Sequence, residues 1–498
     1  VVYFMVYSTL LVGFGIASDD SGAMLDSFRL DEWKEYQHDL TMETIYMWQT
    51  HPWLMESYLG LVEVKEKIVD DSPSLGEKAL NLVVGGLKKL NPFGSASAQV
   101  NSWDGSASTD WQDPDNWSMN QIPDQAFVIE IPSAPSNQPD LNTADGEVGS
   151  LFICDGATLT GSGREVDVYG EHPGTSENLC SSDGGGGTYG DGFAFLVAGA
   201  ISGNLKLEIK TPMFTFVDLH ADDGGNVYDL NINTSGNYVE STGSPTINGD
   251  VTVTDGVLRS SSYGTTMTIG GKLTIKNGSV FGYEGGNAGA MNYTLGSLDI
   301  ESGGKFVNGY QSTTLIDSYF TDGNTIAYRS AYGGTFNHNY GTMKFTETST
   351  VYAYVSNNGY PNDNDNAFFN MILDGGTIYF HPTQSDHMWV HGDVTVTSGE
   401  LRMNGSSQHA TVYGDVRLLE DASGSPGVQF SPMGDDNWTI HGILEGTNGA
   451  EIHGGDLSVG ALRLDNGVLQ SSTSTITIIG TGGILEGDLD AGATFDID

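Results

Sequence analysis

The sequence predicts a mainly β protein, a parallel β-helix or solenoid with coils of about 22–25 residues, preceded by an α-helical N-terminal region. Three observations predict this fold class. A ten-residue phrase returns almost unchanged far along the chain, apolar and polar residues alternate in short runs, and glycine is abundant, with 68 residues and no G-X-Y period. With 38% hydrophobic residues in 498, the chain can also bury a sizeable core.

The repeated phrase sets the period of the coil. Gly249–Leu258 reads GDVTVTDGVL, and Gly392–Leu401 reads GDVTVTSGEL. Looser copies start at Gly271, Gly296, Gly341, Gly414, Gly460 and Gly487. Adjoining copies start 22, 25, 22 and 27 residues apart (249 to 271, 271 to 296, 392 to 414, and 460 to 487).

Strands as short as these cannot bury an apolar face alone, so successive coils must stack at the strand spacing of about 4.8 Å. We therefore expect an acidic β-solenoid over residues 146–498. Tandem β-sandwiches are the competing architecture, because frequent turn signals also fit them.

Residues 1–22 begin with the most apolar stretch of the chain, which runs without a charge from Val1 to Ala17. Its length lies between that of a signal-peptide core and that of the shortest bilayer-spanning helix. It lacks a basic leader, so we interpret it as a hydrophobic helix retained in a processed protein; a leftover signal peptide is the alternative. The residues expected to anchor or assemble the protein are Val1, Phe4, Val6, Leu10, Leu11, Phe14 and Ile16.

Residues 23–94 carry an amphipathic helical pattern, with apolar residues near helical spacing from Leu25 to Tyr36 and an end at Pro92. A hydrophobic N-terminal helix joined to a large β domain resembles the layout of type IV pilins. That family has an acidic residue near the mature N-terminus, where this chain has Met5. The resemblance implies assembly into a filament through the N-terminal helix.

Residues 95–102 are small and are expected to form a linker, and residues 103–145 a Trp-rich opening and capping segment. In the latter, Trp103, Trp111 and Trp117 lie among turn residues. This "W-x-G … W … NW … P" pattern resembles the start of many secreted bacterial β-solenoid surface proteins. The resemblance implies that the first coils begin here and that aromatic rings cover the open end of the stack, whose edge would otherwise accept another strand.

The charge argues against nucleic acid as a partner. With 19 Lys+Arg against 64 Asp+Glu the formal charge is −45, which repels phosphate backbones. Such a coat keeps a β-rich surface soluble, or suits a saline or cation-rich medium. The two cysteines, Cys154 and Cys180, could form a disulfide if the chain is exported, and no CxxC or Cys/His cluster in the sequence indicates zinc.

An enzyme on the same fold is the runner-up. Parallel β-helices include the pectate-lyase-like proteins, and this resemblance implies calcium held by acids and an arginine or lysine as the base. The arginines in the repeats are Arg259, Arg329, Arg402, Arg417 and Arg463. Arg259 and Arg402 follow the two copies of the repeated phrase at the same position, which favours a structural face. No carboxylate pair stands out for hydrolysis, so no catalytic residue is predicted.

Calcium is the one cofactor for which the sequence offers candidates, because clustered Asp and Asn oxygens are its ligands. The candidates are Asn362, Asp363, Asn364, Asp365, Asp222 and Asp223, followed by Asp435 and Asp436; solvated turns are the alternative. We interpret the run His381–His391 as a polar surface loop rather than a metal site. Exposed aromatics for a carbohydrate-binding surface would be Tyr352, Tyr354, Tyr379 and Trp389, unless these rings only stack between coils.

These features predict an extracellular structural protein of the cell surface. In this interpretation it is a pilin-like filament subunit that assembles through residues 1–22 and displays an adhesive solenoid. The expected partners are copies of itself, then membrane lipid or surface glycans, because a retained apolar N-terminus is costly in water unless it is packed. The alternatives are a membrane-anchored β-helix adhesin and a polysaccharide lyase or hydrolase.

Overall fold

The chain divides into two units, between Ala96 and Ser97, inside the predicted linker. In the computed structural model, the described residues run from 99 to 487. The gaps are 134, 171–178, 181–192, 198, 211–214, 220–225, 242–243, 261–263, 282–290, 356–366, 383–386, 404–408, 420–428, 432–436, 448–449, 454–455, 466–467, 471–475 and 481–484. The predicted helical region and all its expected anchor residues lie outside the described residues.

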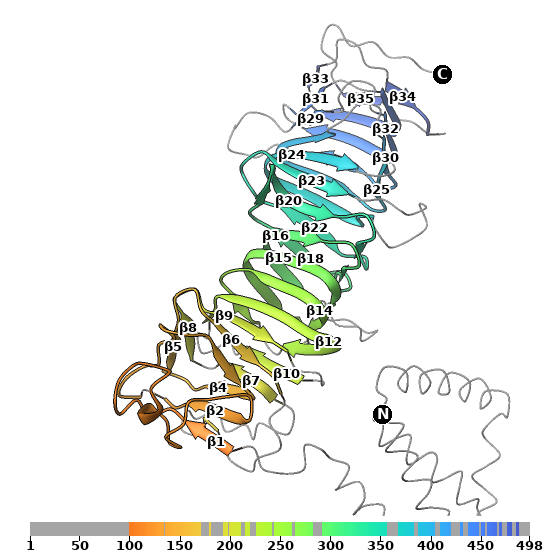
Figure 1. The fold of residues 1–498 in the computed structure, drawn as a ribbon. Coiled ribbons are helices and arrows are strands. Elements are labelled where there is room, and N and C mark those ends of the chain that lie inside the picture. The colour runs from red at the N-terminus through yellow and green to blue at the C-terminus, as the bar shows by residue number, and fades with distance from the viewer. Residues whose placement is uncertain are drawn as a thin grey trace, which may run out of the picture. The chain divides into compact units, whose positions relative to one another are not determined.

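The second unit is a parallel β-solenoid, as predicted (Figure 1). It winds through more than ten turns, and a turn supplies strands to three stacks, here named the first, second and third faces. Every pair of described strands is parallel except β19 (Phe320–Asp322) with β20 (Asn324–Ser330), which form a hairpin. Tandem β-sandwiches are excluded, because their sheets are antiparallel.

Backbone pairing between turns defines the three faces. The first face contains β3 (Gly146–Val148), β6 (Glu165–Val168), β9 (Lys206–Ile209), β12 (Asp229–Ser241), β14 (Val251–Ser260), β15 (Thr266–Phe281), β16 (Asn292–Ile300), β20, β23 (Val351–Val355), β24 (Asn370–Pro382), β26 (Val394–Met403), β29 (Gln429–Ser431), β31 (Glu451–His453) and β33 (Val468–Gln470).

The second face contains β1 (Gln99–Ser102), β2 (Phe127–Ile131), β4 (Ser150–Ile153), β7 (Phe193–Val197), β10 (Thr215–Leu219), parts of β12, β14 and β15, then β17 (Lys305–Val307), β21 (Thr335–Asn337), β25 (His387–Val390), β27 (His409–Val412), β30 (Asn437–Thr447), β32 (Asp456–Asp465) and β34 (Ile476–Ile478). Phe368 bridges to Val390 between β21 and β25.

The third face contains β5 (Thr158–Thr160), β8 (Ala200–Ser202), β11 (Asn226–Val227), β13 (Thr246–Ile247), parts of β15 and β16, then β18 (Thr313–Ile316), β22 (Thr342–Phe345), parts of β24 and β26, then β28 (Val416–Leu418), parts of β30 and β32, and β35 (Leu485–Gly487). A short 3-10 helix spans Pro114–Asn116.

The register gives the length of each turn. Val251 pairs with Leu273, Leu273 with Leu298, and Leu298 with Tyr328, so these turns contain 22, 25 and 30 residues (273 − 251, 298 − 273 and 328 − 298). The first two lengths match the predicted coil. The third is longer because the β19–β20 hairpin is inserted ahead of the first-face strand.

The alternating pattern places every second side chain inside the stack. On β14, Val251 and Val253 are buried, while Thr252 between them is partly exposed. The buried residues of successive turns form one hydrophobic cluster that extends from Trp103 to Ile476. Because a single turn could not bury these side chains, the apolar area covered by stacking is the main stabilising term.

The repeated phrase is explained by a corner between two faces. Asp393 Oδ1 accepts the backbone N–H of Asp415 in the next turn at 2.9 Å. The residue before Asp415 must be glycine, because a Cβ at Gly414 would lie 2.3 Å from the same oxygen. At other corners, a side-chain oxygen likewise accepts a backbone N–H from the following turn. These side chains are Asp229, Asp250, Asn292, Asn370 and Asp415. We call these side chains the corner acceptors.

The two copies of the phrase occupy different corners. In Gly249–Leu258 the first strand segment belongs to the first face and the next to the second face. In Gly392–Leu401 the segments belong to the third and first faces. The corner is therefore a local device that can be used at more than one edge of the solenoid.

The stack begins earlier than the predicted solenoid boundary at residue 146. β1 pairs with β2 and β2 with β4, so the first strand already lies inside the predicted linker 95–102. Trp103, Trp111 and Trp117 are at most 1% exposed, and their rings meet edge to face at 5.0 and 4.7 Å. They fill the core of the first turns, at the end of the stack where the resemblance implied a cap.

Candidate functional site

Several of the predicted site residues lie outside the described residues. These are the calcium candidates Asn362, Asp363, Asn364, Asp365, Asp222 and Asp223, with Asp435 and Asp436. The structure joins Cys154 and Cys180 in a disulfide, with 5.1 Å between their Cα atoms. The carboxylate of Glu130 lies beside both sulfurs and accepts the Cys180 N–H at 3.0 Å. Because sulfurs in a disulfide are not thiolate ligands, this group does not form a metal site.

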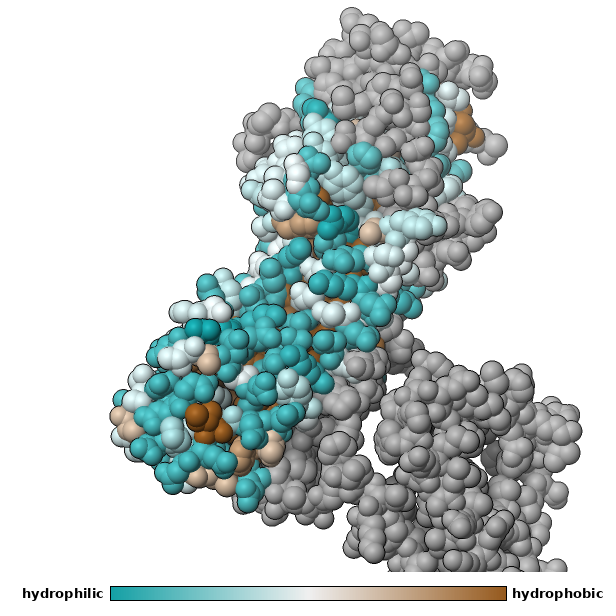
Figure 2. Space-filling model, in the orientation of Figure 1, coloured by the Kyte–Doolittle hydropathy of each residue, from teal (hydrophilic) through white to brown (hydrophobic). Residues whose placement is uncertain are grey.

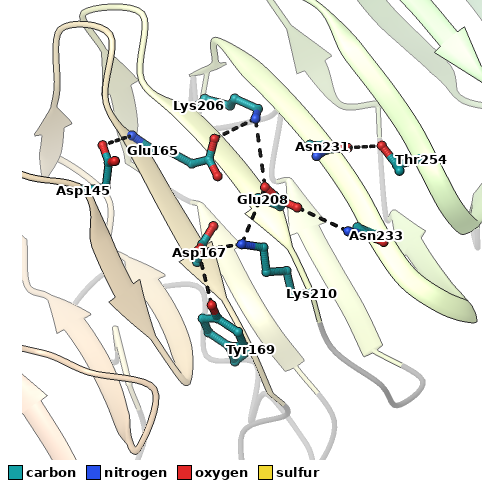
Figure 3. Close-up of polar contacts among 10 residues, drawn as sticks. All are labelled: Asp145, Glu165, Asp167, Tyr169, Lys206, Glu208, Lys210, Asn231, Asn233 and Thr254. Atoms are coloured by element: carbon teal, nitrogen blue, oxygen red, sulfur yellow. Dashed lines mark hydrogen bonds and ion pairs between the residues drawn. The ribbon is translucent and has the colours of Figure 1, made fainter.

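An ionic strip crosses the outer surface of the first face at β6 and β9 (Figure 3). It consists of Glu165, Asp167, Lys206, Glu208 and Lys210. Lys206 Nζ lies 2.6 Å from Glu165 and 4.0 Å from Glu208, and Lys210 Nζ lies 2.6 Å from Asp167 and 3.7 Å from Glu208. Burial alone would lower the pKa of Lys210, but its bond to Asp167 and the nearby carboxylates raise it above its ordinary value.

The ionic strip brings three carboxylates together but leaves little role for a metal ion. Oxygens of Glu165, Asp167 and Glu208 lie within 4.8 Å of one another, yet two ammonium groups already neutralise two of the three negative charges. Towards the next turns the strip continues with neutral groups: Asn233 Nδ2 donates to Glu208 at 3.4 Å (Figure 3). The strip therefore links one turn to the next.

A second charged cluster lies under the β19–β20 hairpin. Asp299 is 1% exposed and accepts two hydrogen bonds from Arg329, at 2.7 and 2.6 Å. Asp322 accepts a third at 2.6 Å, and the ring of Phe320 packs against the cations of Arg329 and Lys272. The bonds to Asp299, then to Asp322, raise the pKa of Arg329 above its ordinary value, although burial opposes this. A lyase base must give up its proton, and this setting favours the charged form.

Other candidate arginines are also held in ion pairs. Arg402 contacts Glu400, and this hydrogen bond is the main cause that raises the pKa of Arg402. Arg417 lies 2.9 Å from Asp393 and 2.6 Å from Asp415. Arg402 is thus held by a carboxylate of its own strand and Arg417 by one of the preceding turn, and this geometry provides no support for proton abstraction.

The histidines do not share one surface loop, which corrects the interpretation of the run His381–His391. His381 belongs to β24 and His387 to β25. At the corner after the second face, five rings form a ring ladder, with neighbouring centroids 5.0–5.6 Å apart. Its members are His338, Phe369, His391, Tyr413 and His441. Sequence reasoning missed this ladder.

His338, which is buried, and His387 and His391, which are half-buried, are neutral rings at neutral pH. Burial, and to a smaller degree His391, lowers the pKa of His338 to about 4, and burial also lowers the pKa of His391. Burial and the neighbouring His409 lower the pKa of His387 to about 4. His338 Nδ1 accepts the Tyr340 N–H at 3.0 Å, so its proton lies on Nε2, where a metal would need a lone pair. The ladder is thus a packing device.

Three of the four aromatics predicted for a carbohydrate surface come together on the first face. Tyr352 and Tyr354 on β23 pair in register with Tyr379 and His381 on β24. We call these four partly exposed rings the tyrosine block. Ring centroids are 5.3 Å apart for Tyr352 and Tyr379, and 5.2 Å apart for Tyr354 and His381. The fourth predicted aromatic, Trp389, lies on the second face and stacks on His387 instead.

Within the described part of the chain, no helix is long and apolar enough to cross a bilayer. Comparison of the chain with models of protein families, with curated proteins and with solved structures finds no match.

Proposed function

We propose that this chain is an extracellular structural protein, a surface filament subunit that assembles through residues 1–22 and displays the solenoid outward as an adhesive rod. One observation carries the proposal: outer side chains are joined from turn to turn. The ionic strip, the Asp299–Arg329 pair, the ring ladder and the corner acceptors all link neighbouring turns. In the described residues, the charged groups thus stiffen a stack instead of converging on a substrate, as expected for a spacer.

Export is supported by two features. The disulfide between Cys154 and Cys180 belongs to an oxidising compartment. The surface of the described residues on the side seen in Figure 2 is largely hydrophilic, with small scattered apolar spots. The Trp-rich opening, similar to that of secreted bacterial β-solenoid surface proteins, agrees with display at the cell surface.

Assembly through the N-terminus is supported by the charge. Solenoids that belong to chains of formal charge −45 repel one another side by side. The uncharged stretch from Val1 to Ala17 is the part of the sequence that gains most from contact with copies of itself. The pilin-like layout of the N-terminal region points to the same contact.

Electron microscopy of the full-length protein tests the proposal. We expect regular fibres, which deletion of residues 1–22 should convert into soluble single rods. The double substitution Phe4→Asp and Leu11→Asp should do the same without shortening the chain. As a control, Tyr310→Asp on the solenoid, where Tyr310 is 46% exposed, should leave the fibres intact.

Two results would contradict the filament. Fibres that persist after the deletion would remove the N-terminus as the assembly element. Single rods that stay in solution only with detergent would assign the chain to the membrane-anchored adhesins instead.

A further inference from the structure

We propose that the disulfide between Cys154 and Cys180 is a redox-sensitive switch. It covers an apolar strip on the outside of the first turns when it is oxidised and uncovers the strip when it is reduced. The inference goes beyond filament assembly, because the switch lies in the solenoid and does not involve residues 1–22. The apolar strip consists of Val100, Val128 and Phe152, and the residues that cover it, here named the covering pair, are Leu179 and Cys180.

The apolar strip lies outside the core of the solenoid. Ile129 on β2 and Leu151 on β4 belong to the main hydrophobic cluster, whereas Val128 and Phe152 beside them belong to a second, separate cluster. Because neighbouring side chains of a strand point to opposite faces, Val128 and Phe152 point out of the solenoid. They are nevertheless only 1% and 2% exposed, so other residues cover them from outside.

Later turns of the second face have polar side chains in their outer positions. His409 on β27 and Thr439 on β30 are examples, and both are partly exposed to water. An apolar strip left open to water would instead favour contact with other apolar surfaces. The first turns therefore need a cover that these later turns do not.

The covering pair supplies this cover. Leu179 and Cys180 belong to the same cluster as the strip. Besides the disulfide, one hydrogen bond holds Cys180 among the described residues, in which its N–H donates to Glu130 Oε1 at 3.0 Å. The backbone of Cys180 has a φ of 58°, in the left-handed region that is unfavourable for residues other than glycine. The covalent bond thus holds the pair in a conformation that the free chain disfavours.

Reduction removes this covalent hold. A dithiol supplies two electrons and two protons: its own sulfurs join in a disulfide, the bond between Cys154 and Cys180 breaks, and two thiols remain on the chain. The covering pair then leaves the strip, because it gains conformational freedom and loses the unfavourable φ of Cys180. The strip is therefore open in a reducing cytosol and covered in an oxidising compartment.

Hydrogen exchange of the full-length protein, with and without dithiothreitol as the dithiol, tests the inference. We expect reduction to raise the exchange rates of β2 and β4 by about tenfold, while those of β25 and β27, far along the stack, change by less than about twofold. The fluorescence of a dye that binds apolar surface should rise in the reduced sample. The double variant Cys154→Ser and Cys180→Ser should show both changes without reductant.

The variant Phe152→Ser tests whether the dye binds to the apolar strip. It removes the largest side chain of the strip, so the rise in fluorescence on reduction should be lost. The matched control is Tyr310→Ser, which removes an aromatic residue that is 46% exposed elsewhere and should leave the rise intact.

Three results would overturn the inference. The first is unchanged exchange in β2 and β4 when both thiols are shown to be free. The second is an equal loss of protection in β25 and β27, which would indicate general destabilisation. The third is a rise in dye fluorescence that Phe152→Ser does not reduce. Loss of fibres would leave all these readouts unchanged, so this inference and the filament can fail separately.

Discussion

The N-terminal and C-terminal turns of the solenoid hold their outer surfaces together by different chemistry. Outer side chains of neighbouring turns stand about 5 Å apart throughout and must contact each other or water. At β6 and β9 the contacts are ion pairs, such as Lys210 with Asp167 at 2.6 Å. In the C-terminal turns stacked rings, such as Tyr413 with His441 at 5.0 Å, lie at one corner beside ion pairs such as Arg417 with Asp393. Ion pairs are screened by salt, whereas a ring stack is disrupted when acid charges a ring, so the ionic strip and the strands beside the ring ladder should respond to different solution conditions.

The largest expected effect comes from acid. His338 has a folded pKa of about 4, below its ordinary value of 6.5, so the unfolded chain binds more protons between these values. The stabilisation is present above about pH 6.5 and is lost as the pH falls towards 4, by about 3 kcal/mol for this residue. His387, with the same shift, adds to the loss. Hydrogen exchange at about pH 7 and 5 should show that protection in β21, β25 and β27 decreases more than that in β6 and β9.

The variant His391→Phe sharpens this test. It keeps a ring in the ladder but removes one titrating group and its effect on His338. The pH dependence of protection in β27 should become weaker. Equal loss of protection in both regions, or an unchanged pH dependence in the variant, would show that the ring ladder does not respond to acid as proposed.

The next largest effect is expected between the two regions, at Asp299. The variant Asp299→Ala leaves Arg329 without its two-bond partner and should cost about 3 kcal/mol in the free energy of unfolding. Asp322 is the other partner of Arg329, and its own side chain is 63% exposed. Asp322→Ala should therefore cost less than about 1 kcal/mol in the free energy of unfolding. Urea unfolding of both variants measures the two values. Similar losses would mean that the burial of Asp299 does not strengthen its ion pair.

A corner glycine should give a smaller, local effect. The variant Gly414→Ala places a Cβ about 2.3 Å from Asp393 Oδ1 and 2.5 Å from the Gly392 carbonyl, and should cost about 2 kcal/mol. At Gly170 the nearest atom to an added Cβ is 3.7 Å away, so Gly170→Ala serves as the control with little change. Urea midpoints compare the two. If Gly170→Ala lowers the free energy of unfolding as much as Gly414→Ala, the close contact at the corner does not explain why glycine recurs in the repeated phrase.

The same corners show how far the sequence predicts the fold. The coil length of 22–25 residues could be predicted because the glycine and the acceptor beside it are local and recur in the sequence. The face on which each copy lies could not, because Gly249–Leu258 and Gly392–Leu401 fit different corners equally well. Inserted segments such as the β19–β20 hairpin change the number of residues between corners, and no local sequence pattern predicts where they occur.

The side-chain contacts on the outer surface are harder to predict than the length of the coil, because they join residues that lie a full turn apart in the sequence. Tyr352 and Tyr379 were singled out as exposed aromatics, but only the register shows that they meet and that Trp389 lies elsewhere. The ring ladder does have a local signal in the sequence. An aromatic residue stands directly before a corner glycine in His391-Gly392, Tyr413-Gly414 and His441-Gly442.

The smallest effect, from salt, completes the comparison. Raising sodium chloride to about 1 M shortens the screening length to about 3 Å and should weaken each pair of the ionic strip by less than about 1 kcal/mol, since Lys206 and Glu165 are 40% and 29% exposed. Protection from hydrogen exchange should fall slightly in β6 and β9 and stay constant in β27, whose residues belong to no charged pair in the described part of the chain. The variant Lys206→Met should remove part of the response, because the salt then acts on one pair fewer. A response of equal size in both regions would mean that salt acts on the burial of apolar surface common to all turns, and the contrast between ion pairs and rings would then contribute nothing measurable to stability.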